Sequence, residues 1–104
     1  MKVKIGPINY LIEKKTAQQL KRIRGEEDFV GLANHKDSKI LLLEGMAPEF
    51  SNLILMHEIV HGLASVYGVD SLQADENGVH SLAVGICNLL QDNPWLVRKF
   101  LVKK

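Results

Sequence analysis

Residues 53–64 read LILMHEIVHGLA, an apolar run interrupted by the polar side chains of His57, Glu58 and His61. A helix that is apolar on nearly every side is normally buried in a protein core. Burying three polar side chains without partners would cost on the order of 1 to 3 kcal/mol each, so something must satisfy them. This stretch therefore predicts a buried helix that carries a polar site.

The spacing of the three polar residues points to a metal ion. His57 and His61 are four residues apart, which places both imidazoles on one face of a helix, one turn apart. Both can then reach one ion, while Glu58 projects beside them towards a metal-bound water. This is the H-E-x-x-H spacing of zinc metalloproteases. The alternative is a pair of core histidines, each hydrogen-bonded to a backbone carbonyl, but the full pattern on an apolar helix favours the metal site.

Helical patterns continue on both sides of this stretch. The residues around it run without a breaker and predict a long helix over 49–67. Ser71 is expected to cap a second long helix over 71–93, and residues 95–102 could add a last helical turn or two. Earlier in the chain, residues 16–24 are strong helix formers and predict a short, mostly exposed helix.

A third metal ligand is expected on the second long helix. Catalytic zinc sites usually have three protein ligands and keep the fourth position for water. The first turn of that helix holds Asp75 and Glu76, and its apolar stripe includes Val79 and Ala83. This stripe places Glu76 near the core-facing side and Asp75 about 100° away, towards solvent. We therefore predict Glu76 as the ligand and Asp75 as the fallback; alternatively, Glu76 only interacts with the helix dipole.

Other polar side chains could assist this site. His80 lies one turn beyond Glu76, where it could orient a metal ligand or donate a hydrogen bond to a tetrahedral intermediate. A half-exposed helix histidine is the alternative. Tyr67 and Tyr10 are the other candidate oxyanion donors, and each is also explained as an aromatic at the edge of the core. His35 lies in a polar loop and is expected to be solvated.

The first half of the chain predicts strands. Short apolar, β-branched runs at residues 3–5 and 8–12 flank a Gly-Pro turn signal and predict a hairpin or a kinked strand. Two further runs, at 29–33 and 39–43, flank the polar loop 34–38 and form the clearest β pattern in the chain. Strands followed by helices predict an α+β domain, with a small antiparallel sheet packed against the two long helices.

Composition limits the class of protein. The 104 residues are enough for one compact domain, which we expect to span residues 1–104. Thirteen Lys+Arg against twelve Asp+Glu leave a net charge of +1, which provides no broad attraction for nucleic acid or anionic lipid. Cys87 is the one cysteine, read as a small core residue, so no intramolecular disulfide is possible. We expect a cytoplasmic protein without a signal peptide that binds neither nucleic acid nor a membrane.

Three stretches together resemble the small phage-type members of the ImmA/IrrE-like metallopeptidases. They are HEIVHG at 57–62, ENGVHSLA at 76–83 and LLQDNP at 89–94, within a resemblance that covers roughly residues 29 to 96. These enzymes are gluzincins, in which two histidines and a glutamate from the next helix hold zinc.

The resemblance implies a zincin-like fold and a zinc metalloendopeptidase acting on a peptide or protein substrate. His57, His61 and Glu76 would hold the zinc, and Glu58 would be the catalytic base. It also implies that the strand over 39–43 lies along the cleft, where its edge could pair with an extended peptide.

The chain departs from the family in two respects. Ala47 stands where such proteins often have a capping Ser or Asp, and the sequence carries no helix-turn-helix through which larger relatives meet repressors and DNA. A phage or host regulatory protein is the expected substrate class. Some very small gluzincins are kept latent by a terminal segment, so residues 95–104 could cover the site; packing of an apolar tail helix is the alternative.

Two other functions are consistent with parts of the sequence. One is a catalytically silent, zinc-stapled module that binds a regulatory partner. Structural zinc sites are usually closed by four ligands and rich in cysteine, whereas three ligands without sulfur are expected here; His80 as a fourth ligand would favour this function. The other is a DNA-associated regulator, against which the absence of a basic stripe counts.

Overall fold

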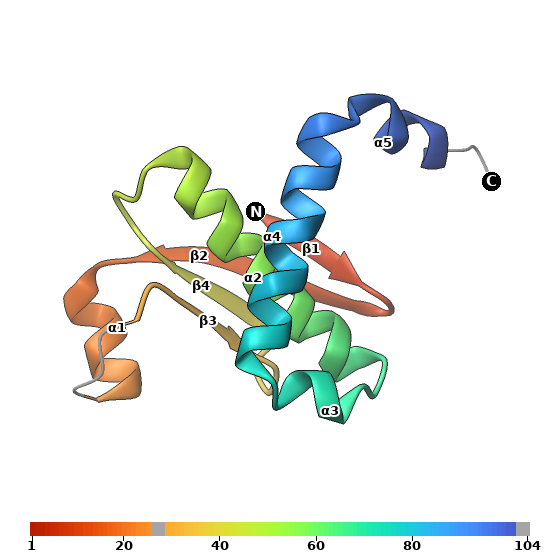
Figure 1. Ribbon diagram of the computed structural model, residues 1–104. Helices are drawn as coiled ribbons and strands as arrows, with labels where there is room; N and C mark the ends of the chain where they lie inside the picture. The colour runs from red at the N-terminus through yellow and green to blue at the C-terminus, as the bar shows by residue number, and fades with distance from the viewer. Residues whose placement is uncertain (26–28, 102–104) are drawn as a thin grey trace.

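The computed structural model describes residues 1–25 and 29–101 and confirms the α+β class (Figure 1). One four-stranded sheet is formed by β1 (Lys2–Ile5), β2 (Ile8–Lys15), β3 (Gly31–Asn34) and β4 (Lys39–Leu43). The helices in the described part of the chain are α1 (Ala17–Arg24), α2 (Pro48–Val66), α3 (Asp70–Gln73), α4 (Glu76–Asp92) and α5 (Pro94–Phe100).

The sheet is mixed, so the prediction of an antiparallel sheet is wrong. Its strand order is β1-β2-β4-β3; the two outer pairs are antiparallel, and the central pair, β2 and β4, is parallel. Each outer pair is a hairpin, as predicted for β3 and β4; for β1 and β2 the structure shows the hairpin and not the kinked strand. Parallel neighbours need a crossover connection, and α1 lies in the one that follows β2. The local patterns of two hairpins do not specify how the hairpins join.

The strand order also shows that the expectation of a free, peptide-binding edge on the strand over 39–43 is wrong. β4 is paired on both sides, with β2 and with β3, so it has no free edge along a cleft. β3 is the edge strand on this side of the sheet, and β1 is the edge strand on the other side. Any extended chain that pairs with this end of the sheet must therefore do so along β3.

Side-chain caps mark where α1 and α4 begin, but not where α2 begins. Thr16 and Gln19 form a capping box at the start of α1, as the helix formers after Thr16 predict. α2 begins at Pro48 after Ala47, which provides no side-chain cap. The predicted helix from Ser71 is interrupted: α3 ends at Gln73, and α4 begins only after Asp75, whose side chain accepts a hydrogen bond from the backbone N–H of Gly78.

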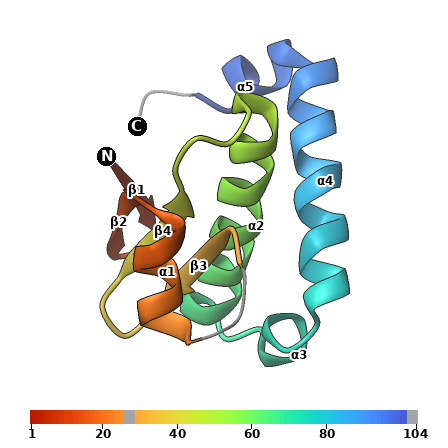
Figure 2. The ribbon, with the colours of Figure 1, turned by 90° about the vertical axis from the view of Figure 1, so that its left-hand side faces the viewer.

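The sheet, α2 and α4 form successive layers (Figure 2). α2 packs on β1, β3 and β4, while α4 packs on α2 rather than on the sheet. An apolar core lies between the sheet and α2, and a smaller one lies between α2 and α4. The two long helices are therefore stacked, which corrects the expectation that both pack against the sheet.

Close packing of α2 on the first hairpin depends on Gly62. A Cβ at this position would come 2.7 Å from Cδ1 of Ile5, too close for an unstrained contact.

The C-terminal end of the described structure lies away from this packing. α5 packs at the end of α4 that is distant from α3 (Figure 1), and none of its residues lines the cleft described below. Residues 95–101 thus do not cover that cleft, and the rest of the tail segment, 102–104, lies outside the described residues. Among the described helices, none combines the length and apolar character needed to cross a bilayer.

Candidate metal centre

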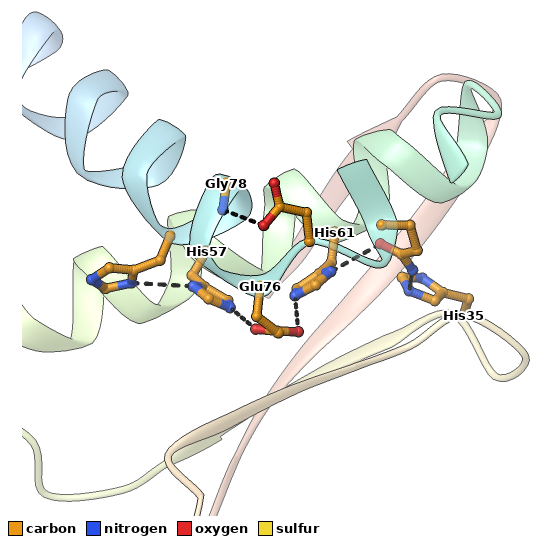
Figure 3. A network of polar contacts seen from close by, with 8 residues as sticks. His35, His57, His61, Glu76 and Gly78 are labelled. Atoms are coloured by element: carbon orange, nitrogen blue, oxygen red, sulfur yellow. Dashed lines mark hydrogen bonds and ion pairs between the residues drawn. The ribbon is translucent and has the colours of Figure 1, made fainter. Parts of the chain in front are cut away.

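The structure brings the three predicted ligands together between α2 and α4. Nε2 of His61 lies 2.9 Å from Oε1 of Glu76, and Nε2 of His57 lies 3.2 Å from Oε2 of the same carboxylate. One ligand atom from each residue lies within 4.8 Å of the others. Figure 3 shows the Glu76 carboxylate between the two imidazole rings. A metal ion could therefore be held by all three residues.

The start of α4 places Glu76 at this point. Asp75 is the N-cap residue, and its Oδ1 lies 3.0 Å from the backbone nitrogen of Gly78. A Cβ at Gly78 would collide with the Asp75 carboxylate, so glycine leaves room for the cap. The Asp75 carboxylate is thus used in capping and is not in the ligand group, whereas Glu76, one residue later, turns towards α2.

Each histidine ligand is held on its other nitrogen. Nδ1 of His61 donates to Oε1 of Gln73 at 2.9 Å, and Nδ1 of His57 lies 3.4 Å from Nδ1 of His80. Both Nε2 atoms are therefore the ones that face Glu76. Metal-binding histidines usually have this arrangement, with one nitrogen for the ion and the other hydrogen-bonded to the protein. The donor set and its orientation therefore fit a bound metal ion.

Electrostatics favours a neutral imidazole at His57. Burial lowers the pKa of His57, and the charge of His61 acts in the same direction. A histidine must be neutral to bind a metal ion. The environment of His57 therefore prepares this side chain for coordination rather than for a lasting positive charge.

Glu58 is buried beside the ligands, with 7% of its surface exposed. Burial raises the pKa of Glu58 to about 7, against the opposing charge of His61 and a hydrogen bond from the backbone of Ala33. Glycine at position 31 makes this approach possible: a Cβ there would come 2.6 Å from Ile54 and 3.1 Å from Oε2 of Glu58. The edge strand and Glu58 are therefore packed together without an intervening side chain.

Among the described strands, β3 pairs with β4 alone, which leaves its outer edge for a further strand. Leu43 N–H donates to Val30 C=O at 2.9 Å, so these residues form a hydrogen-bonded pair. Because hydrogen-bonded and non-hydrogen-bonded pairs alternate, Gly31 and Ala33 direct their backbone groups away from β4. Glu58 takes the Ala33 N–H, and the other outward groups of Gly31 and Ala33 point to the free edge.

A cleft joins these elements. It is lined by the three candidate ligands and Glu58, by His35, Gln73 and His80, and by residues 29–33. Ile54 and Arg24 complete the lining. The Arg24 guanidinium lies 5.3 Å from the centroid of the Phe29 ring, which also lines the cleft. The cleft thus contains a polar centre, an edge strand and one stacked cation.

Of the other residues predicted to assist the site, only His80 lies in the cleft. His80 lines the cleft, as expected for a residue that assists the site. Tyr10 and Tyr67 do not line it: Tyr10 is buried with its hydroxyl on His35, and Tyr67 is exposed at the end of α2. Cys87 is half-buried and is not in the ligand group.

The prediction that His35 is solvated is wrong. Its Nδ1 lies 3.0 Å from the Tyr10 hydroxyl and its Nε2 lies 2.7 Å from Nε2 of Gln73. The loop folds back on itself because Asn34 and Asp37 are hydrogen-bonded to each other, which a polar composition alone does not indicate. Gln73 was missed for a similar reason, since nothing in its local sequence marks it as a partner of His61.

Comparison with family models, with curated proteins and with solved structures gives no match for this chain. The functional inference therefore depends on the site itself.

Proposed function

We propose that this protein is a zinc-dependent metalloendopeptidase of gluzincin type, with a zincin-like fold. The observation that carries the proposal is the convergence of His57, His61 and Glu76 beside the buried carboxylate of Glu58. Two imidazoles and one carboxylate, without sulfur, form the ligand set of catalytic zinc sites that keep a position open for water. A buried base next to such a set is what peptide hydrolysis requires.

Zinc, when bound, would polarise a peptide carbonyl and lower the pKa of a coordinated water towards ~7. Glu58 then takes a proton from the attacking water and passes it to the leaving amine. Burial places the pKa of Glu58 at about 7, so the carboxyl group can both accept and donate a proton near neutral pH. Its ionised form is favoured next to a dication, and the Ala33 N–H holds it in place.

The open edge of β3 is the proposed binding site for substrate. An extended peptide can add to an exposed sheet edge through main-chain hydrogen bonds. The outward N–H and C=O of Gly31 and the outward C=O of Ala33 provide such bonds directly beside Glu58. This arrangement suits a protein substrate with an unfolded segment, and the family resemblance points to a phage or host regulatory protein.

His80 is proposed to assist through His57. Its Nδ1 is in hydrogen-bonding distance of the His57 Nδ1, which supports a role in orienting that ring. A second possibility is that its other nitrogen stabilises the oxyanion, since His80 also lines the cleft. The variant His80→Asn separates these roles, because loss of ring orientation weakens zinc binding, whereas loss of an oxyanion donor lowers turnover at full zinc occupancy.

Metal analysis together with a broad peptide-cleavage screen tests the proposed function. We expect one zinc per chain in the wild type and in Glu58→Gln, and loss of zinc in Glu76→Gln. Only the wild type should cleave peptides. A zinc-loaded Glu58→Gln variant that cleaves as fast as the wild type would contradict the role of Glu58. Zinc binding without any cleavage would favour the zinc-stapled binding module instead.

A further inference from the structure

Both nitrogens of the His61 ring are held by residues only three positions apart in the chain. Gln73, the last residue of α3, accepts from Nδ1, and Glu76, the first residue of α4, lies at Nε2. The turn between α3 and α4 thus contacts the His61 imidazole at both of its nitrogens. Position and plane of this ring are set by a single short segment.

The amide of Gln73 determines which partner donates in its hydrogen bonds to His61 and His35. An amide has a carbonyl that only accepts and an NH₂ group that only donates. Oε1 faces His61, so the ring must present its proton on Nδ1, and its Nε2 is left for a metal ion. The NH₂ end donates to Nε2 of His35, which must therefore present a lone pair there.

The far end of this chain of contacts is anchored in the core. With its Nε2 accepting, a neutral His35 carries its proton on Nδ1 and donates it to the Tyr10 hydroxyl. Tyr10 is 1% exposed, and burial lowers the pKa of His35, which favours the neutral ring. The series Tyr10, His35, Gln73 and His61 therefore connects β2, the β3–β4 loop, α3 and α2.

We infer that Gln73, held by His35 and Tyr10, is a positioning residue that sets the tautomer and orientation of His61 for metal binding. This inference rests on the proposed metal centre and extends it beyond the three ligands. The series does not relay protons, because a neutral amide has no proton to pass on at ordinary pH. Its effect is to raise metal affinity by preparing Nε2 of His61 before the ion arrives.

Zinc titration of the metal-free protein tests this role without any peptide substrate. Gln73→Met removes both hydrogen-bonding ends at similar side-chain length, and we expect zinc affinity to fall by about 10- to 100-fold. Gln73→Glu keeps an acceptor for the His61 Nδ1–H and should restore most of the affinity. Gln91→Met, a matched change on the exposed surface of α4, should leave affinity unchanged.

Nitrogen-15 NMR of the zinc-loaded protein gives a readout that a merely structural role would not change. In the wild type we expect protons on Nδ1 of both His61 and His35. Gln73→Met should expose the His61 Nδ1–H to rapid exchange with water. In Gln73→Glu, a carboxylate can only accept, so His35 should move its proton to Nε2 while His61 keeps its own on Nδ1.

Unchanged zinc affinity in Gln73→Met, with the His61 Nδ1–H still protected, would overturn the inference. If that variant does not fold, Gln73→Glu still decides, because an unaltered His35 tautomer contradicts the assigned contacts. A wild type that binds no zinc would overturn this inference together with the proposed function. Zinc affinity that responds to Gln73 in a protein that cleaves nothing would support the inference and remove only the peptidase activity.

Discussion

Two adjoining regions along α2 differ in what holds them together. Towards the sheet, α2 buries an apolar cluster that contains Ile5, Ile40, Leu42 and Ile54. Towards the start of α4, the same helix presents the ligand group, with a buried carboxylate and hydrogen-bonded imidazoles. The apolar side gains free energy from burial alone, whereas the polar side must offset the desolvation of charged groups. Apolar burial against the sheet therefore stabilises the fold, whereas the region near the start of α4 carries the polar groups of the candidate metal centre.

Truncation on the apolar side should have the largest effect on stability. Ile40 is completely buried in the cluster between the sheet and α2. Ile40→Ala should lower the free energy of unfolding by about 2 to 5 kcal/mol, with or without zinc. Denaturant unfolding of the wild type and of Ile40→Ala, each with zinc and with a chelator, measures this loss. A loss that disappears in the presence of zinc would mean that the two regions are not independent.

Removal of the buried Glu58 carboxylate should raise the stability of the metal-free protein, whereas truncation of Ile40 lowers it. The pKa of Glu58 rises from 4.5 to about 7 on folding, so the folded state binds the proton more tightly. Stability of the metal-free protein should therefore be greatest below pH 4.5 as far as this group is concerned, and fall as the pH rises to 7. Glu58→Gln should remove this decline, an effect of at most about 3 kcal/mol near neutral pH. If the free energies of unfolding of the wild type and of Glu58→Gln change with pH in the same way, the raised pKa of Glu58 is contradicted.

A methyl group at Gly31 should disturb both regions at once. Its Cβ would press on Ile54 of the apolar cluster and on Glu58 of the polar site. Gly31→Ala should cost about 1 to 3 kcal/mol in unfolding experiments and lower peptidase activity more than zinc content. The matched control is Gly85→Ala in α4, where a Cβ meets nothing within 4 Å. That control should be neutral or stabilise by up to about 1 kcal/mol.

The smallest effect is expected at the cap of α4. Asp75→Ala removes the acceptor for the Gly78 N–H and should cost about 1 kcal/mol in thermal unfolding. Because this cap also sets the first turn that carries Glu76, zinc affinity should fall as well. The comparison is Ala47→Ser, at the start of α2, where no side-chain cap exists. It should gain up to about 1 kcal/mol and leave zinc affinity unchanged.

The sequence predicts features that are encoded over short distances. The two hairpins, the long helix with His57 and His61, and the convergence of Glu76 follow from patterns within one or two elements. The parallel pairing of β2 with β4 does not, because it depends on how a crossover places two hairpins. The break after Gln73 was also missed, since Ser71 and Asp75 are both acceptable caps and only packing chooses between them.

Residues that act through others are the hardest to predict. His35, Gln73 and Tyr10 come from three separate elements, and their mutual contacts exist only in the folded chain. Sequence alone indicates which side chains can bind a metal ion, but not which polar residues hold them. That second group determines orientation, so it is found from geometry rather than from spacing.

The most direct test of the account is thermal unfolding of the wild type and of Glu76→Gln, each with zinc and with a chelator. If the polar side of α2 is a metal centre, zinc should raise the melting temperature of the wild type. At a zinc concentration 100 times the dissociation constant, the stabilisation should be about 2.7 kcal/mol. Glu76→Gln should show little or none of it. Equal melting temperatures of the wild type with zinc and with chelator would contradict the central claim.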